Sequence, residues 1–274
     1  MTPYSLPIVR VECPVPGVGV AYTKRGSNAP SRARAGHSSN PYEAFNLGLH
    51  VGDDPSAVQA NRRALEHALH VKPLWLQQVH GRQVVHLEQA LDPQAENFVG
   101  LGPKADVSVS SITGHACAII TADCLPVLMA SANGQVVGAA HAGWRGLANG
   151  VIASLIEAMQ QVSPGACTGG LWAWLGPCIG FDQFEVGGEV VSALKANLAT
   201  EAHFKPSAAE RWLADLPQIA ARQIEVELAA RGLPQIGIAE DTACTFSNPS
   251  SFYSYRREAK TGRMAALIWR FADP

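Results

Sequence analysis

Two continuous apolar runs with a short break between them constrain the fold of this chain more than any other feature. The runs span residues 116–121 and 125–130, and Asp123 and Cys124 lie in the break. Apolar runs without polar alternation are typical of strands covered on both faces of a sheet. We therefore expect a layered protein in which an acid and a thiol stand where two buried strands end.

The remaining pattern predicts more strands than helices. Short apolar or alternating segments predict strands at 74–79, 107–110, 136–140, 171–175 and 264–271. Capping residues and helical spacing predict helices from Asp53 to about residue 70 and over 146–162, 185–198 and 215–232. A polar stretch rich in Gly, Ser, Arg and Pro predicts a flexible loop at 23–41. Because strands and helices do not alternate regularly, an α+β fold is favoured over a doubly wound one.

The bulk composition favours a single domain that spans residues 1–274. A chain of 274 residues with 47% hydrophobic content has enough apolar surface for one large core. The sequence shows no repeat of fixed period and no linker long enough to divide it.

Charge and cysteine usage exclude several classes of partner. The 21 basic and 23 acidic residues nearly balance, so nothing indicates binding to nucleic acid or to an anionic membrane. We expect neither a signal peptide, because Arg10 and Glu12 interrupt the first segment, nor a membrane-spanning run. The six cysteines are scattered without a C-x-x-C pair, which is typical of reduced thiols. A cytoplasmic protein that binds a small molecule fits these features.

Three candidate metal ligands each follow an apolar strand and lie within two residues of a Gly or an Asp. They are His80, Cys124 and His141. Two imidazoles and one thiolate suit Zn²⁺, and three protein ligands leave the fourth tetrahedral position for water or substrate. The pattern therefore favours a catalytic zinc site over a structural one.

Two other interpretations of the same residues remain open. In a metal-free site, His141 would lower the pKa of Cys124, Asp123 would orient the imidazole, and the thiolate would attack a carbonyl carbon. His80 then has no role, which favours the metal. Alternatively, a thioether such as Met129 could complete a copper site with the same three donors. In the zinc site, Asp123 would accept a hydrogen bond from a ligand imidazole or act as a general base.

Two segments carry groups suited to an anion or a base. Arg145 stands at a predicted helix start, where backbone amides and the guanidinium favour phosphate. Residues 244–257 interleave four aromatic residues with Arg256 and Arg257, a composition that can stack a base and pair a phosphate.

The sequence lacks the motifs that two zinc or copper enzyme classes require. No H-x-H pair occurs among the nine histidines, although a multicopper oxidase of the usual kind needs such pairs. A cytidine-deaminase site needs H-x-E and P-C-x-x-C. Here Ala142 and Gly143 follow His141, and Cys178 has no second cysteine three residues on.

A set of short motifs from about Gly36 to Trp269 resembles the YfiH/laccase-domain family. No single motif is specific, but the combination is. The motifs are Asn46-Leu-Gly-Leu-His-Val-Gly-Asp53, Gln78-Val-His-Gly81, Thr121-Ala-Asp-Cys-Leu-Pro126, His141-Ala-Gly-Trp-Arg-Gly146, Leu175-Gly-Pro, Phe184-Glu-Val-Gly187, Ser254-Tyr-Arg-Arg257 and Thr261-Gly-Arg263.

The resemblance implies a fold, a metal and several activities. The fold would be an α+β sandwich of two mixed sheets flanked by helices, similar to cytotoxic-necrotising-factor-like cysteine hydrolases. The family pattern also implies Zn²⁺ on the residues matching His80, Cys124 and His141. Family members are described as purine nucleoside phosphorylases for adenosine, inosine and methylthioadenosine with adenosine deaminase activity, as copper polyphenol oxidases, or as peptidoglycan-editing factors.

The leading hypothesis is accordingly a zinc-dependent purine nucleoside phosphorylase with adenosine deaminase activity. Arg145 with Arg256 or Arg257 would position phosphate, and Asp123 would handle protons or orient a ligand. Ser38 and Asn46 are further candidate substrate contacts. The alternatives are an amidase that edits cell-wall precursors, a copper oxidase and a non-enzymatic binding module.

Overall fold

The two apolar runs form neighbouring strands that belong to different sheets. They are β6 (His115–Thr121) and β7 (Leu125–Ser131), and Asp123 and Cys124 lie in the short segment that crosses from one sheet to the other. This computed structural model describes residues 6–26, 36–91, 102–163, 165–196 and 203–272. Every residue of β7 is buried, as expected for a strand covered on both faces.

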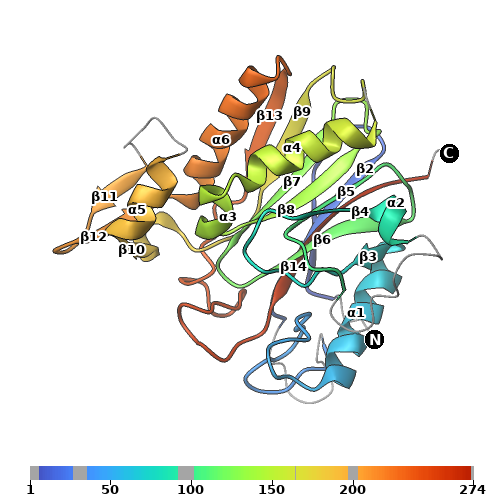
Figure 1. Cartoon of the computed structure of the whole chain (residues 1–274). Coiled ribbons are helices and arrows are strands. Elements are labelled where there is room, and N and C mark those ends of the chain that lie inside the picture. The colour runs from blue at the N-terminus through green and yellow to red at the C-terminus, as the bar shows by residue number, and fades with distance from the viewer. Residues whose placement is uncertain (1–5, 27–35, 92–101, 164, 197–202, 273–274) are drawn as a thin grey trace.

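The two sheets that this segment connects are both mixed (Figure 1). The five-stranded sheet has the order β1 (Ile8–Val11), β2 (Val18–Thr23), β14 (Met264–Arg270), β6 and β3 (Lys72–Leu74), and only its β3–β6 pair is parallel. The six-stranded sheet has the order β13 (Gln235–Glu240), β9 (Leu171–Leu175), β7, β8 (Val137–Ala142), β5 (Val107–Ser110) and β4 (Val84–His86), with parallel pairs at both edges. A small sheet joins β10 (Glu185–Gly187), β12 (Arg211–Ala214) and β11 (Phe204–Pro206).

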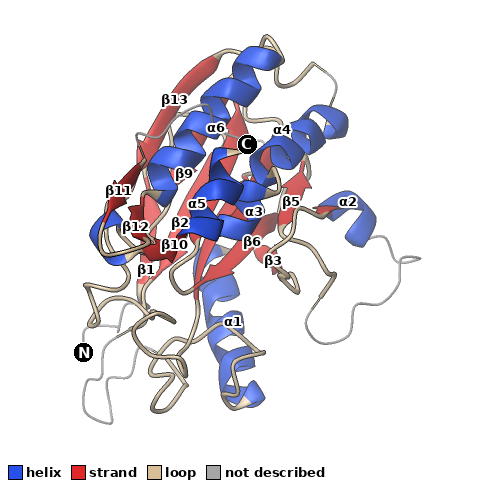
Figure 2. Ribbon diagram, turned by 60° about the vertical axis from the view of Figure 1, so that its left-hand side comes forward, coloured by secondary structure: helices blue, strands red, loops and turns tan. Residues whose placement is uncertain are grey.

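Helices cover the outer face of each large sheet (Figures 1 and 2). The six-stranded sheet packs against α3 (Trp144–Ala148), α4 (Val151–Val162) and α6 (Leu216–Ala230), and the five-stranded sheet packs against α1 (Pro55–Leu69). The remaining helices are α2 (Leu87–Ala90), α5 (Gly188–Lys195) and a 3₁₀ turn at Phe181–Gln183. The contact of each large sheet with its helices forms a hydrophobic core. A third core lies between the two large sheets, where the rings of Tyr22 and Trp174 stack with centroids 5.6 Å apart. The predicted α+β sandwich of two mixed sheets is confirmed.

The helices that begin at an aspartate start where the sequence predicted. Asp54 accepts a hydrogen bond from the backbone N–H of Ser56 at the start of α1, at 2.9 Å. Asp215 accepts one from Gln218 at the start of α6, at 3.2 Å. Each carboxylate satisfies an amide that the helix itself leaves unpaired.

Two predicted helices are shorter than expected. The helix predicted at 146–162 is interrupted at Asn149 and Gly150, where Gly150 has a φ of +81° that an α-helix cannot accommodate. The helix predicted at 185–198 begins with the strand β10, and α5 starts only at Gly188. Residues 197–198 lie outside the described residues.

The continuous strand predicted at 74–79 is wrong, because β3 ends at Leu74 and only Gln77 pairs again, in an isolated bridge with Lys104. Beyond it, the Gln78 side chain takes the place of strand pairing. Its amide group donates to the Ile120 carbonyl at 2.8 Å and accepts from the Ile120 N–H at 2.8 Å. The strand predicted at 136–140 instead runs to Ala142, so His141 lies within β8 and not after it.

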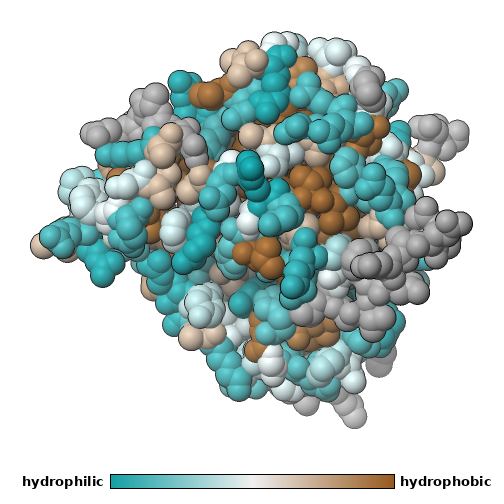
Figure 3. Space-filling view, in the orientation of Figure 1, coloured by the Kyte–Doolittle hydropathy of each residue, from teal (hydrophilic) through white to brown (hydrophobic). Residues whose placement is uncertain are grey.

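Other parts of the prediction are placed as follows. In the predicted loop at 23–41, Thr23 ends β2, residues 24–26 and 36–41 form neither helix nor strand, and 27–35 lie outside the described residues. All six cysteines are unpaired, as expected. Among the described helices, none has the length and apolar character needed to cross a bilayer. On the face shown in Figure 3, hydrophobic residues gather in small separate groups among hydrophilic ones.

One glycine in the five-stranded sheet tests the packing of this core. Gly19 lies opposite Trp269, and a Cβ at Gly19 would stand 2.3 Å from the fully buried indole ring. We expect Gly19→Ala to lower the free energy of unfolding by about 1–3 kcal/mol, because the ring has no space to move into. Gly169→Ala is the control, because its Cβ would only touch Ala132 at 3.4 Å. Urea unfolding of both variants measures the difference, and equal stabilities would contradict the packing.

Candidate functional site

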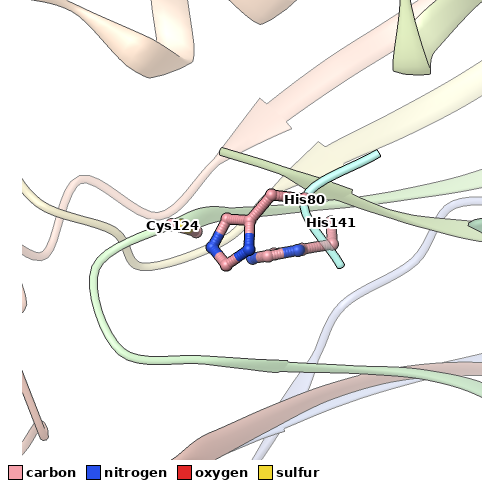
Figure 4. Close-up of side chains that lie close together, drawn as sticks. All are labelled: His80, Cys124 and His141. Carbon is pink, nitrogen blue, oxygen red and sulfur yellow. The ribbon is translucent and has the colours of Figure 1, made fainter. Parts of the chain in front are cut away.

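Three donor side chains from distant parts of the chain converge where the sheets meet (Figure 4). Their candidate ligand atoms, on His80, Cys124 and His141, all lie within 4.8 Å of one another. The centroids of the two imidazole rings are 4.8 Å apart, with the rings tilted at 64°. His80 comes from the segment before β4, Cys124 from the crossing between sheets, and His141 from the end of β8.

The donor set fits a zinc ion. Ligand atoms on one tetrahedral Zn²⁺ stand roughly 3.3–3.7 Å apart, given Zn–N and Zn–S bonds of about 2.0 and 2.3 Å. The candidate ligand atoms lie within 4.8 Å of one another, and His80 is exposed, so its ring has room to move toward an ion. Thiolate and imidazole are both donor types that bind zinc.

A buried carboxylate that carries no sequence signal holds the ring of one candidate histidine and the backbone of the other. Asp106 is fully buried and accepts a hydrogen bond from Nδ1 of His141 at 2.9 Å. The same carboxylate accepts from the backbone N–H groups of Val79, His80 and Gly81 at 3.1, 2.9 and 2.7 Å. Because Nδ1 of His141 faces a carboxylate, its Nε2 is the atom left with a lone pair for a metal.

The electrostatics favour the thiolate form of Cys124 and the protonated form of His141. Burial alone would raise the pKa of the Cys124 thiol, but the charge of His141 and hydrogen bonds with His141 and His80 bring that pKa below its ordinary value. Burial would lower the pKa of His141, yet the Cys124 thiolate and the Asp106 carboxylate raise it. A thiolate is the form of cysteine that binds metals and attacks carbon.

The three donors open onto a cavity of about 520 Å³. This volume lies in the range of sites for small molecules, roughly 300–1,000 Å³. The cavity wall carries three guanidinium groups, each above an aromatic ring. These pairs are Arg145 with Trp144 at 4.3 Å, Arg256 with Phe184 at 5.3 Å and Arg263 with Tyr255 at 5.8 Å from the ring centroid. The site can therefore bind an anion and stack a planar ring.

Asp123 lines the cavity, but its carboxylate is hydrogen-bonded to a loop near the C-terminus and not to a candidate ligand imidazole. Its carboxylate accepts from the hydroxyls of Thr245 and Ser254 at 2.6 and 3.0 Å and from the Arg256 N–H at 2.7 Å. All three donors belong to residues 244–257, which we call the cavity loop. The acid that pairs with a candidate ligand imidazole is Asp106.

The two arginines of the cavity loop have different positions. Arg256 is exposed, lines the cavity and donates one hydrogen bond to the Glu185 carbonyl at 3.0 Å. The Arg257 guanidinium points into the loop and donates to the carbonyls of Thr245, Phe246 and Phe252, each at 2.8 Å. Of the two, the structure brings Arg256 to the cavity.

Ser38 and Asn46 lie outside the cavity wall. Both are fully buried. The Ser38 hydroxyl accepts from the Asn61 side-chain amide at 3.0 Å, and the side-chain oxygen of Asn46 accepts from the backbone N–H of Arg263 at 2.8 Å. Asn46 thus holds the backbone of a cavity residue without facing the cavity itself.

Met129 is also separated from the donors. It is fully buried in the core between the six-stranded sheet and its helices. Five residues of extended strand separate it from Cys124, a distance of roughly 16 Å. It cannot supply the axial thioether that a copper site would need.

Several cavity residues were not among the site residues predicted from the sequence. His50, Phe184 and Arg263 line the cavity together with the predicted residues. They come from segments far apart in the chain, so only the fold brings them together. Their one common signal is that each lies in or beside a family motif.

Comparison with known proteins agrees with this architecture. Residues 29–271 match the family described as multi-copper polyphenol oxidoreductase laccase. The chain belongs to the YfiH family. A Pseudomonas aeruginosa member named purine nucleoside phosphorylase is 43% identical over 250 residues, covering 88% of this chain and 95% of its own. Purine nucleoside phosphorylase YfiH of Escherichia coli is 41% identical over 248 residues, covering 89% and 94%.

Solved YfiH-type structures share the fold. Protein NMB0706 of Neisseria meningitidis superposes with a TM-score of 0.83 at 37% identity, covering 97% of this chain and 100% of its own. YlmD from Geobacillus stearothermophilus superposes with a TM-score of 0.81 at 28% identity, covering 96% of each chain. The resemblance inferred from the motifs is confirmed.

Removing the Asp106 carboxylate tests its role beneath the imidazoles. Each of its oxygens accepts from two N–H groups, so the amide of Asp106→Asn would face two donors. We expect Asp106→Asn to lower zinc affinity about 10–100-fold, nearly as much as Asp106→Ala. A titration of zinc against a competing chelator measures the affinity. Wild-type affinity in Asp106→Asn would contradict the assignment.

Removing a donor tests the metal centre directly. We expect Cys124→Ala or His141→Ala to lose the zinc, about one ion per chain, that the wild type retains after dialysis. Far-ultraviolet circular dichroism should show that the fold persists. Cys13→Ala, which removes a half-buried thiol outside the cavity, is the control. Full zinc content in either donor variant would refute the site.

Proposed function

We propose that this chain is a zinc-dependent purine nucleoside phosphorylase for adenosine, inosine and methylthioadenosine, and that the same cavity deaminates adenosine. The observation that carries the proposal is a single cavity in which three metal donors adjoin both guanidinium groups and aromatic rings. Relatives that are 36–43% identical bear the name purine nucleoside phosphorylase, which supports the same reaction.

Phosphorolysis needs a bound anion next to a bound nucleoside. A phosphate oxygen forms a bond to C1′ of ribose, the bond from C1′ to the purine nitrogen breaks, and the purine leaves with that electron pair and takes up a proton. Arg145 and Arg256 would bind the phosphate, because both guanidinium groups are exposed in the cavity wall. The rings of Phe184 and Tyr255 would stack on the purine.

His80, Cys124 and His141 would hold the zinc ion, with Asp106 fixing the orientation of His141. When bound, zinc supplies a Lewis acid and lowers the pKa of water. That chemistry suits the proposed deamination, in which water oxygen replaces the exocyclic amine at C6 of adenine and ammonia leaves.

A second candidate function is hydrolysis of an amide in a cell-wall precursor. The observation that favours it is the line of groups from Cys124 through His141 to Asp106, which resembles a nucleophile, its base and the acid that orients the base. This reaction would release an amino acid from a UDP-linked muramoyl substrate. A copper oxidase has weaker support, because Met129 is too distant to act as an axial ligand.

Substrate profiling on one metal-analysed preparation separates these functions. We expect adenosine, inosine and methylthioadenosine to release their bases only when phosphate is present, with ribose 1-phosphate (or its methylthio analogue) as the second product. Adenosine alone should yield inosine and ammonia. Chelation should remove deaminase activity, and added Zn²⁺ should restore it. Amino-acid release from the muramoyl substrate without phosphorolysis would favour the amidase, and blue absorbance of the purified protein would favour copper.

A charge-removal variant tests the phosphate contact. We expect Arg145→Gln to raise the KM for phosphate about tenfold or more, because a charged hydrogen bond to the anion is lost. Zinc content should stay unchanged. Arg222→Gln is the matched control, because that exposed arginine lies on α6 and pairs with Glu225. An unchanged KM for phosphate in Arg145→Gln would remove Arg145 from the proposed site.

A further inference from the structure

We infer that Asp123 is a positioning residue that fixes the cavity loop, and that it does not transfer protons. The inference rests on the proposed function only where it names phosphate as the anion bound by Arg256. Asp123 lies directly before Cys124, between β6 and β7, so it joins the metal donors to the loop that carries Arg256.

The carboxylate reaches both ends of the cavity loop. One oxygen accepts from the Thr245 hydroxyl at 2.6 Å. The other accepts from the Ser254 hydroxyl at 3.0 Å and the Arg256 backbone N–H at 2.7 Å. The backbone of Arg256 is therefore tied directly to the residue that precedes Cys124.

The backbone of Asp123 shows that its surroundings hold it in place. Its φ is +97°, a value that residues other than glycine rarely adopt. Such conformations persist where several contacts determine them. Besides the three bonds of its carboxylate, the Asp123 carbonyl accepts from the N–H of Ile179 at 2.9 Å.

Hydrogen bonds inside the cavity loop hold it together, so we expect it to move as one unit if its attachment to Asp123 is lost. Arg257 fills the interior of the loop and binds the carbonyls of Thr245, Phe246 and Phe252. The Ser254 hydroxyl also accepts from the Arg257 N–H at 3.2 Å. With the interior held this way, the Asp123 carboxylate sets where Arg256 and Tyr255 stand in the cavity wall.

The same contacts argue against Asp123 as a general base. A carboxylate that takes up a proton must offer a lone pair to the substrate. The Asp123 side chain is 9% exposed, and both of its oxygens already accept hydrogen bonds from the loop.

The chemistry of the donors provides a sharp test. Thr245 meets one oxygen through a hydroxyl, which can rotate and accept from an amide as readily as it donates. Asp123→Asn can therefore keep all three bonds with its amide nitrogen toward Thr245. At Asp106 the same change fails, because every partner is an N–H donor.

The kinetic experiment compares Asp123→Asn with Asp123→Gly in the zinc-loaded protein. Glycine accepts the positive φ, so this variant removes the carboxylate without forcing the backbone. We expect Asp123→Asn to keep KM for phosphate and kcat within about threefold of wild type. We expect Asp123→Gly to raise the KM for phosphate about tenfold or more while zinc content is retained. A kcat about 10²–10⁴-fold lower in Asp123→Asn, with KM unchanged, would instead identify a base and overturn the inference.

A second measurement does not depend on the reaction. Hydrogen exchange at the Arg256 amide, in zinc-loaded protein without substrate, should be protected in wild type and Asp123→Asn and much faster in Asp123→Gly. Asp215→Ala, which removes the cap of α6, is the control and should leave this amide protected. Equal exchange in Asp123→Gly and wild type would overturn the inference. If protection follows the prediction but no nucleoside is cleaved, the proposed function fails and the positioning role stands.

Discussion

One buried carboxylate supports the arrangement of the candidate metal centre. Asp106 accepts hydrogen bonds from three backbone N–H groups of the segment that carries His80 and from the ring N–H of His141. It directly precedes β5, which pairs with both β4 and β8. Because the carboxylate is fully buried, its four hydrogen-bond donors also offset the free-energy cost of removing its charge from water. The His141 ring and the backbone of His80 are thus held in place before any ion binds.

The site has two sides, each organised by its own aspartate. On one side Asp106 accepts hydrogen bonds only from N–H groups, which orient the His141 ring and fix the backbone of His80. On the other, Asp123 takes hydroxyls and one amide and holds the cavity loop. Cys124 lies between them, next to Asp123 in sequence. This division separates the residues suited to a metal from those suited to an anion and a purine ring.

Features with a local physical cause were predictable from the sequence. The buried strands β6 and β7 follow from uninterrupted apolar runs, and α1 and α6 follow from aspartate caps. The strand expected at 74–79 failed because the Gln78 side chain pairs with Ile120 in place of backbone. Asp106 was missed because its partners come from 25 or more residues away and nothing beside it marks a site. Convergence of Phe184 and Arg263 likewise required the fold.

The Gln78 contact makes the two halves of the sandwich mechanically interdependent. Through it, the segment bearing His80 is attached to Ile120 of the five-stranded sheet, whereas His141 belongs to the six-stranded sheet. The backbone of the same segment donates to Asp106, directly before β5 of the six-stranded sheet, so the residues around His80 are bonded to both sheets. An ion bound by His80 and His141 would add one more link across this junction and would stabilise the folded state by binding it.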